Sequence, residues 1–168
     1  MLDNLTGQVA VVTGSGSGIG AAITQSFLNA GAKVLATGKR IEKLKKLGSH
    51  EGLSIMAGDI TEPAFADQLL GRALDEFGRC DIVANNAGVM WSGAAHEIEI
   101  DHVVSMVRVN IEAAFRVAHV FVKHFFQQNS GQIINTSSVL GTKVRANAGA
   151  YSATKYAVEA LSEAMRLE

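Results

Sequence analysis

The sequence predicts an α/β fold in which helices cover both faces of a doubly wound parallel sheet. Short apolar runs alternate along the chain with longer stretches of helical periodicity. The runs are apolar at consecutive positions, which is typical of strands that are buried on both faces. With 168 residues, of which 48% are hydrophobic, the chain can bury the core of a single domain that spans residues 1–168.

The first half of the chain is predicted to form two strand–helix units and a third strand. Residues 9–12 are consecutively apolar and lead through a glycine-rich turn into a helix at 19–30. A second apolar run at 33–37 follows the glycine that ends this helix, and 41–47 is predicted to be helical. The third strand is the run at 53–56, which a glycine precedes.

The second half of the chain continues the same alternation. A helix at 64–77 starts directly after the only proline of the chain and ends before a glycine. A strand at 82–84, a long helix at 103–128, a strand at 132–135 and a helix at 150–167 follow. Because strands and helices alternate, we expect the strands to run parallel.

A glycine-rich turn, Thr-Gly-Ser-Gly-Ser-Gly-Ile-Gly at residues 13–20, joins the first strand to the first helix. Glycines tolerate positive φ and let a ligand approach the backbone, and the first amides of a helix attract anions. The turn therefore predicts a pyrophosphate-binding site, although its composition is also compatible with a purely structural role. The residues predicted to bind a dinucleotide here are Gly14, Ser15, Ser17, Gly18, Ile19 and Gly20.

The residues after the second strand predict which dinucleotide binds. An acidic residue at this place commonly accepts hydrogen bonds from the adenosine ribose hydroxyls, whereas a basic residue suits a 2′-phosphate. The chain has Gly38 where the acid would stand, followed by Lys39 and Arg40. Two cations can pair with a phosphate, so we expect NADP(H) rather than NAD(H). The alternative is a solvated loop, in which case only the missing acid favours NADP.

Three polar residues in the last part of the sequence form a candidate catalytic group. Tyr151 and Lys155 are four residues apart and would share one face of a helix, where the ammonium favours the phenolate form of the tyrosine. Ser138 would lie at the carboxyl end of the fifth strand, where open parallel sheets gather ligands. A tyrosine and a lysine at this spacing also occur as ordinary exposed pairs, and Ser137 competes with Ser138 for its role.

The motifs of the chain resemble those of the short-chain dehydrogenase/reductase family. The glycine spacing Gly14-x3-Gly18-x-Gly20 is similar to the family's first motif, and Asn-Asn-Ala-Gly at 85–88 is similar to its second. The resemblance runs from about Leu5 to the last residue. The remaining landmarks stand in matching order: Asp59, Asn110, Ser138 and Tyr151-x3-Lys155.

The resemblance implies a Rossmann-like sheet of five strands in the order 3-2-1-4-5 and a nicotinamide cofactor. It also implies that Asp59 or the amide of Ile60 holds the adenine edge. The family's cofactor contacts after the fourth strand correspond to Asn86, Ala87 and Gly88. From the residues alone, Asp59 is equally an ordinary turn residue, and the asparagines of the second motif can bond the backbone of a turn.

The resemblance also implies a mechanism. Tyr151 donates a proton to a carbonyl oxygen during reduction, or removes one during alcohol oxidation, while Ser138 holds the substrate oxygen. Lys155 bonds the nicotinamide ribose, and Asn110 anchors a water that links Lys155 to solvent. The expected protein is an NADP-dependent oxidoreductase for a small carbonyl or secondary alcohol substrate. The alternatives are a 3-oxoacyl-carrier-protein reductase and a non-catalytic nucleotide-binding module.

Members of the family continue beyond the helix at 150–167 with a sixth strand, a helical substrate lid and a seventh strand, and none of these is found in this sequence. We therefore expect the domain to be incomplete at its C-terminus. The strand at 132–135 would then present an unpaired apolar edge. The helices at 103–128 and 150–167 resemble those of the family's dimer interface, which implies a homodimer or homotetramer of the full-length protein.

Charge and composition argue against several other classes of function. The formal net charge of -1 offers no field that would attract nucleic acid or an anionic membrane. No apolar run approaches the roughly 20 residues that span a bilayer, and the first residues lack the pattern of a signal peptide. The five histidines lack metal-ligand spacing, and the single cysteine fits a reducing compartment. We therefore expect a cytoplasmic protein without a metal.

Overall fold

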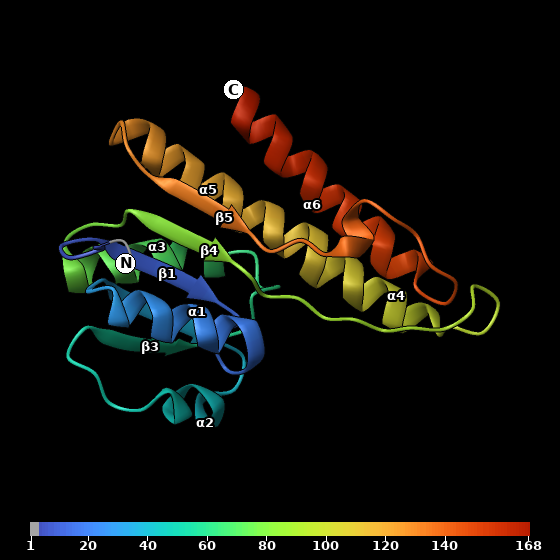
Figure 1. Ribbon diagram of the computed structural model, residues 1–168, viewed down its shortest axis with the longest axis horizontal. Coiled ribbons are helices and arrows are strands. Elements are labelled where there is room, and N and C mark those ends of the chain that lie inside the picture. The colour runs from blue at the N-terminus through green and yellow to red at the C-terminus, as the bar shows by residue number, and fades with distance from the viewer. Residues whose placement is uncertain (1–3) are drawn as a thin grey trace.

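The computed structural model describes residues 4–168. Its strands are β1 (Val9–Thr13), β2 (Lys33–Gly38), β3 (Leu53–Ala57), β4 (Ile82–Asn85) and β5 (Gln132–Asn135). They form a parallel sheet in the order β3-β2-β1-β4-β5 (Figure 1). This order confirms the doubly wound fold that the sequence predicts. Strands β2 and β3 lie on one side of β1, and β4 and β5 lie on the other, so the direction of the strand order reverses between β1 and β4.

The helices lie close to where the sequence predicts them, with two differences. The predicted helix at 41–47 tightens after Leu44 into a 3-10 turn, Lys45–Leu47. The predicted helix at 103–128 begins at Ile100 and contains a π-helical segment, Val107–Ala113, because hydrophobic periodicity does not reveal a locally widened turn. The helices are α1 (Gly18–Asn29), α2 (Ile41–Leu44), α3 (Phe65–Phe77), α4 (Ile100–Met106), α5 (Ala114–Gln127) and α6 (Gly149–Leu167).

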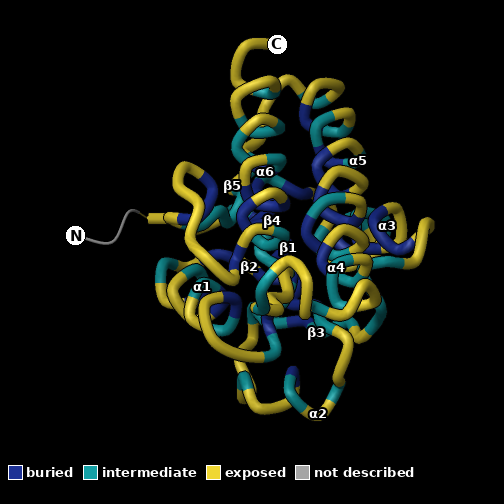
Figure 2. Tube along the Cα trace, turned by 90° about the vertical axis from the view of Figure 1, so that its right-hand side faces the viewer, coloured by how far each residue is buried: buried dark blue, intermediate teal, exposed yellow. Residues whose placement is uncertain are grey.

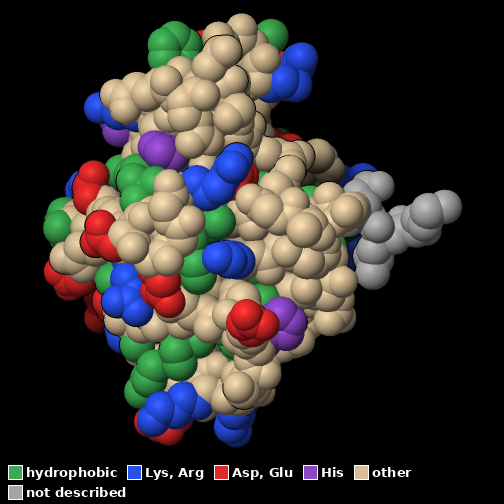
Figure 3. Space-filling model, turned by 90° about the vertical axis from the view of Figure 1, so that its left-hand side faces the viewer, with side chains coloured by type: hydrophobic (Ala, Val, Ile, Leu, Met, Phe, Trp, Pro, Cys, Tyr) green, Lys and Arg blue, Asp and Glu red, His purple; other side chains and the backbone are tan. Residues whose placement is uncertain are grey.

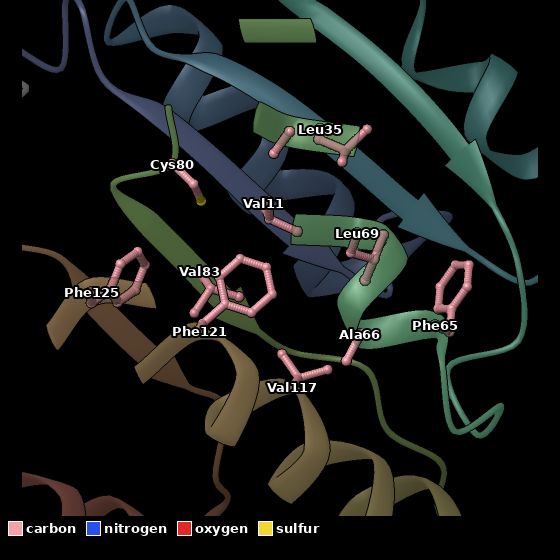
Figure 4. Close-up of a cluster of buried hydrophobic side chains, with 11 residues drawn as sticks. Val11, Leu35, Phe65, Ala66, Leu69, Cys80, Val83, Val117, Phe121 and Phe125 are labelled. Carbon is pink, nitrogen blue, oxygen red and sulfur yellow. The ribbon is translucent and has the colours of Figure 1, made fainter. Parts of the chain in front are cut away.

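The core has two layers, one on each face of the sheet. One layer packs α3 and α5 against β1 and β4, with Val11, Val83 and Phe121 among its members (Figure 4). The other layer packs α1 against the opposite face and includes Val12 and Leu28. Val11 and Val12 are neighbours in β1 but enter different layers, because side chains alternate along a strand. This explains why the strand is apolar at consecutive positions.

Strand β5 lies at one edge of the sheet. Among the described strands it pairs only with β4, from Gln132 opposite Ile82 to Asn135 opposite Asn85, and Ile134 is 37% exposed. A hydrogen bond of 2.9 Å from the side-chain amide of Asn135 to Ser162 Oγ ties β5 to α6. In residues 4–168 this strand therefore has an open edge.

The two ends of the sheet differ in character. Figure 2 looks onto the end at which the strands finish, where loops and the helices α1, α2 and α4 surround the strand ends. Figure 3 shows the opposite end, where lysine and arginine side chains are interspersed with aspartate and glutamate. Within the described residues, no helix is both long and apolar enough to cross a bilayer.

Candidate active site

The turn between β1 and α1 requires glycine at three places for reasons of backbone geometry. Gly14 and Gly18 have φ angles of 70° and 55°, in the left-handed region that favours glycine. Gly20 has no room for a side chain, because a Cβ there would collide with the carbonyl of Gly14. The turn therefore places the start of α1, with its unpaired first amides, close to the end of β1.

Ser15 stabilises this turn from inside. Its hydroxyl donates to the Val12 carbonyl over 2.7 Å and accepts from Thr24 Oγ1 over 3.1 Å. Its backbone N–H donates to the carbonyl of Thr37, 2.9 Å away in β2. Ser15 is buried, so its side chain lies beneath the turn.

The loop after β4 is fixed to the same turn through Thr13. The Thr13 hydroxyl accepts the backbone N–H groups of Asn86 and Ala87, each over 2.9 Å. The side-chain amide of Asn86 donates to the Thr13 carbonyl over 3.0 Å, whereas that of Asn85 donates to a backbone carbonyl of α5 over 2.9 Å. The Asn86 side chain therefore bonds the turn, as the structural interpretation of this motif expects, whereas the Asn85 side chain ties β4 to α5.

A cavity of about 640 Å³ opens at the carboxyl ends of the strands. Its volume is within the range of small-molecule and cofactor sites, and it lies at the edge where open parallel sheets hold ligands. The predicted cofactor residues that line it are Gly14, Ser17, Lys39, Arg40, Asp59, Ile60, Ala87 and Gly88. The predicted cofactor residues outside its lining are Ser15, Gly18, Ile19, Gly20, Asn86, Tyr151 and Lys155.

The sequence motifs do not reveal one wall of this cavity. Val104, Ser105, Arg108 and Val109 line it from α4 and the π-helical segment. Their spacing, two adjacent pairs four residues apart, marks one face of a helix, but no motif indicates that this face turns toward the glycine-rich loops. Lys43 on α2 also lines the cavity without belonging to a motif.

Lys39 and Asp59, which the sequence assigns to different parts of the cofactor, pair with each other. Lys39 Nζ lies 2.7 Å from Asp59 Oδ2. The hydrogen bond from Lys39, followed by one from the Thr61 backbone, lowers the pKa of Asp59 to about 2. The same hydrogen bond raises the pKa of Lys39. Asp59 Oδ1 accepts from the N–H and the hydroxyl of Thr61 over 3.0 Å and 2.8 Å, so both carboxylate oxygens have partners.

Lys155 is buried on α6. Its Nζ donates to the Thr136 carbonyl over 2.7 Å and lies 5.8 Å from the centre of the Tyr151 ring. Burial lowers the pKa of Lys155, because the protein interior solvates an ammonium less well than water does. Tyr151 and Lys155 thus lie one turn apart in α6 with the ammonium over the ring.

Asn110 lies in the π-helical segment and joins three parts of the site. Its Oδ1 accepts the N–H of Val89 and its Nδ2 donates to the Val89 carbonyl, both over 2.8 Å. Nδ2 also donates to Thr154 Oγ1 of α6 over 3.1 Å. A Cβ added to Gly88 would stand 3.3 Å from Asn110 Oδ1 and 3.8 Å from Lys155 Nζ. Gly88, which lines the cavity, is therefore next to the catalytic candidates.

Ser138 stands directly before a short 3-10 turn, Val139–Gly141. Its Oγ accepts the N–H of Leu140 over 3.2 Å. No acceptor for the Ser138 hydroxyl proton occurs among the described residues, so this proton is available to a bound oxygen atom. The neighbouring Ser137 Oγ is buried, packs against Gly141 and has no hydrogen-bond partner within residues 4–168.

Cavities at the point where the order of a parallel sheet reverses are typical of dinucleotide-binding α/β proteins, and this chain has the features of that class. The comparison with family models narrows the class, since the model described as short chain dehydrogenase matches residues 8–168. The chain belongs to the short-chain dehydrogenase family, as its motifs indicate. Membership implies a nicotinamide cofactor and, for an oxidoreductase, a small-molecule substrate.

Individual relatives agree with this assignment. An uncharacterized oxidoreductase of Staphylococcus aureus (strain USA300) is 37% identical over 167 residues, which cover 98% of this chain and 72% of that protein. An uncharacterized oxidoreductase of Staphylococcus saprophyticus is 34% identical over 170 residues, which cover 99% of this chain and 69% of that protein. The crystal structure of a short-chain dehydrogenase from Streptomyces avermitilis matches with a TM-score of 0.88 at 31% identity, over 94% of this chain and 59% of its own. This chain therefore spans less than the full length of each.

Proposed function

We propose that the protein transfers a hydride reversibly between NADP(H) and a carbonyl or secondary alcohol, with Tyr151 as the acid/base. The observation that carries this proposal is the position of Gly88, which lines the cavity and lies beside both Asn110 and Lys155. A dinucleotide in the cavity would therefore extend to the Tyr151–Lys155 pair. When bound, the nicotinamide ring supplies or accepts the hydride.

The residues of the cavity fit a dinucleotide. Gly14 and Ser17 line it beside the N-terminus of α1, so the backbone N–H groups of Gly18, Ile19 and Gly20 and the positive end of the helix dipole can hold a pyrophosphate. Thr37 Oγ1 is buried in the lining and has no partner within residues 4–168. A buried hydroxyl without a partner is a group that a polar ligand satisfies.

Four side chains are assigned roles in the proton chemistry. The phenol of Tyr151 donates its proton to the carbonyl oxygen in reduction and takes it back in oxidation. The Lys155 ammonium, 5.8 Å from the ring centre, stabilises negative charge on the phenolic oxygen. The hydroxyl of Ser138 donates a hydrogen bond to the same substrate oxygen and keeps its proton. Asn110, beside Gly88, anchors the water that links Lys155 to solvent.

We infer a preference for NADP(H) over NAD(H) from the charge of the cavity. Gly38 lines it at the place where a carboxylate would repel a 2′-phosphate. Cationic side chains outnumber carboxylates in the lining, which suits the additional phosphate of NADP(H). The cations are Lys39, Arg40, Lys43 and Arg108, and the carboxylates are Asp59 and Asp101.

Replacing Tyr151 with phenylalanine tests the proposed acid/base. The variant keeps the ring over which Lys155 lies but loses the transferable proton, so we expect turnover of a carbonyl substrate to fall about 100-fold or more while NADPH binding is retained. NADPH absorbance measures turnover across a panel of ketones and aldehydes in the natural protein, and NADPH fluorescence measures binding.

Tyr156→Phe is the matched control, because Tyr156 is the next tyrosine of α6 and is 44% exposed. This variant should turn over like the wild type. Residual activity of Tyr151→Phe close to the wild-type level would refute the proposed role. A wild-type protein that binds NADPH and reduces no member of the panel would instead favour a non-catalytic nucleotide-binding module.

A further inference from the structure

One corner of the cavity is formed by three segments that are separate in the sequence. Lys43 lines the cavity, and its Cβ would be 3.1 Å from a Cβ added to Gly16, so the lysine side chain starts against the glycine-rich turn. A Cβ added to Gly38 would be 3.6 Å from the backbone nitrogen of Gly16. The turn after β1, the end of β2 and α2 therefore meet at this corner.

This corner is where the 2′ position of an adenosine ribose is expected. In dinucleotide folds the residue at the end of the second strand faces the ribose hydroxyls, and Gly38 is that residue here. A phosphate at the 2′ position would therefore face Gly38, with Gly16 and Lys43 as its neighbours.

Lys39 follows Gly38 directly but is engaged with another residue. Its Nζ is 2.7 Å from Asp59 Oδ2, and the Asp59 side chain is 30% exposed. If Lys39 turned to a 2′-phosphate, the Asp59 carboxylate would remain in the cavity lining without its cation and beside a second anion. Two negative charges in one partly enclosed cavity repel each other. The pairing with Asp59 therefore opposes the use of Lys39 as a phosphate ligand.

Lys43 and Arg40 are not engaged in this way. Within residues 4–168 neither makes an ion pair, whereas Nζ of Lys45, at the start of the following 3-10 turn, lies 3.8 Å from Oε1 of Glu42. Lys43 and Arg40 both line the cavity. A guanidinium can bind two phosphate oxygens in a planar fork, and an ammonium supplies a compact charge that can approach a third.

We propose that Lys43, together with Arg40, binds the 2′-phosphate of NADP(H), while Lys39 stays paired with Asp59. This assignment rests on the proposed NADP(H) preference and identifies the second cation that produces it. Lys43 is a specificity-determining residue in this proposal, and Lys39 neutralises a carboxylate that would otherwise weaken the binding of the phosphate.

The test measures dissociation constants in the natural protein rather than activity. Lys43→Met, Lys39→Met and Lys46→Met each remove one charge and keep an unbranched side chain; Lys46 is exposed and outside the cavity lining, which makes it the matched control. NADPH and NADH are titrated by fluorescence, and adenosine 2′,5′-bisphosphate by calorimetry. We expect Lys43→Met to weaken the binding of NADPH and of the bisphosphate about 10-fold or more. The affinity for NADH should stay within about twofold of the wild-type value.

The two other variants separate the assignment from its alternatives. Lys39→Met should leave the ratio of NADPH to NADH affinity closer to wild type than Lys43→Met does, and Lys46→Met should change neither affinity. An unchanged ratio in Lys43→Met overturns the assignment, as does a Lys39→Met variant that loses the preference for NADPH to the same extent. Equal affinity of the wild-type protein for NADPH and NADH would instead overturn the NADP(H) preference itself. Retained NADH affinity shows that each variant is folded.

Discussion

The carboxyl group of Asp59 makes the stability of the protein depend on pH in the acid range. Hydrogen bonds, first from Lys39 and then from the Thr61 backbone, lower its pKa from 3.8 to about 2, so the folded protein holds the charged form more strongly than the unfolded chain does. This contribution is present above pH 3.8 and is lost as the pH falls through about 2. We expect Asp59→Asn to lower the free energy of unfolding near neutral pH, with a difference from wild type that shrinks as the pH falls toward 2.

Urea unfolding at a series of pH values measures this difference. The exposed Asp75 of α3 provides the control, because Asp75→Asn changes the same functional group away from the cavity. A difference between Asp59→Asn and wild type that does not depend on pH would contradict the assigned cause.

The pairing of Lys39 with Asp59 also shows what single residues in a sequence do not reveal. The two residues are twenty positions apart, and each has a plausible role of its own in binding a cofactor. Their contact depends on the register of β2 and β3, in which Gly38 lies opposite Ala57. Motif spacing along one strand carries no information on this register, so the sequence predicts both residues at the site but not their interaction.

At the scale of single elements, the start of α1 depends on glycine at position 20. Gly20→Ala places a Cβ against the carbonyl of Gly14, and relieving such a contact costs about 1–3 kcal/mol. We expect the variant to lose this amount in free energy of unfolding and to bind NADPH more weakly, because the turn and the first amides of α1 must move apart. Denaturant unfolding and NADPH fluorescence measure the two effects.

Gly71 is the matched control for this substitution. It lies within α3, and nothing is within 4 Å of a Cβ added there, so Gly71→Ala should stabilise the protein by up to about 1 kcal/mol through helix propensity. A Gly20→Ala variant as stable as the wild type would show that the turn adapts at no cost.

The elements themselves follow closely from hydrophobic periodicity, with one informative exception. The buried strands and α1, α3 and α6 lie within one or two residues of their predicted bounds. Hydrophobic periodicity does not predict the π-helical segment Val107–Ala113, because this segment changes the backbone without interrupting the apolar pattern. Arg108 and Val109 of this segment line the cavity, and Asn110 bonds the loop after β4, so the exception lies at the site.

At the scale of the whole molecule, Phe121 connects α5 to the core layer that includes β1 and β4. Its side chain is fully buried, so Phe121→Ala should lower the free energy of unfolding by about 3–5 kcal/mol. A domain of this kind has a total stability of about 5–15 kcal/mol, so we expect partial or complete unfolding of the variant at moderate temperature. Denaturant or thermal unfolding followed by circular dichroism measures the loss.

Ile100→Ala is the control for burial, since Ile100 also belongs to a helix but is 69% exposed. This variant should stay within about 0.5 kcal/mol of wild type. If Phe121→Ala were equally mild, α5 would not be held to the sheet by the layer described above.

The location of the cavity is a property of the whole fold and could be predicted from the sequence. The alternation of strands and helices specifies a parallel sheet, and the reversal of its order between β1 and β4 specifies where ligands gather. The shape of the cavity could not be predicted in the same way. Val104 and Arg108 line the cavity from α4 and the π-helical segment, which lie far from the glycine-rich turn in the sequence. Only the packing of these elements in three dimensions brings the two residues to the same cavity as the turn.

Hydrogen bonds to the hydroxyl of Thr13 hold the loop after β4 in its conformation. This hydroxyl accepts two backbone N–H groups of that loop, from Asn86 and Ala87, so one side chain of β1 holds together both loops on which a dinucleotide would rest. A loop that is already ordered loses little conformational entropy when a ligand associates with it. The affinity of this part of the site would therefore be set by the contacts it offers rather than by the freedom it gives up.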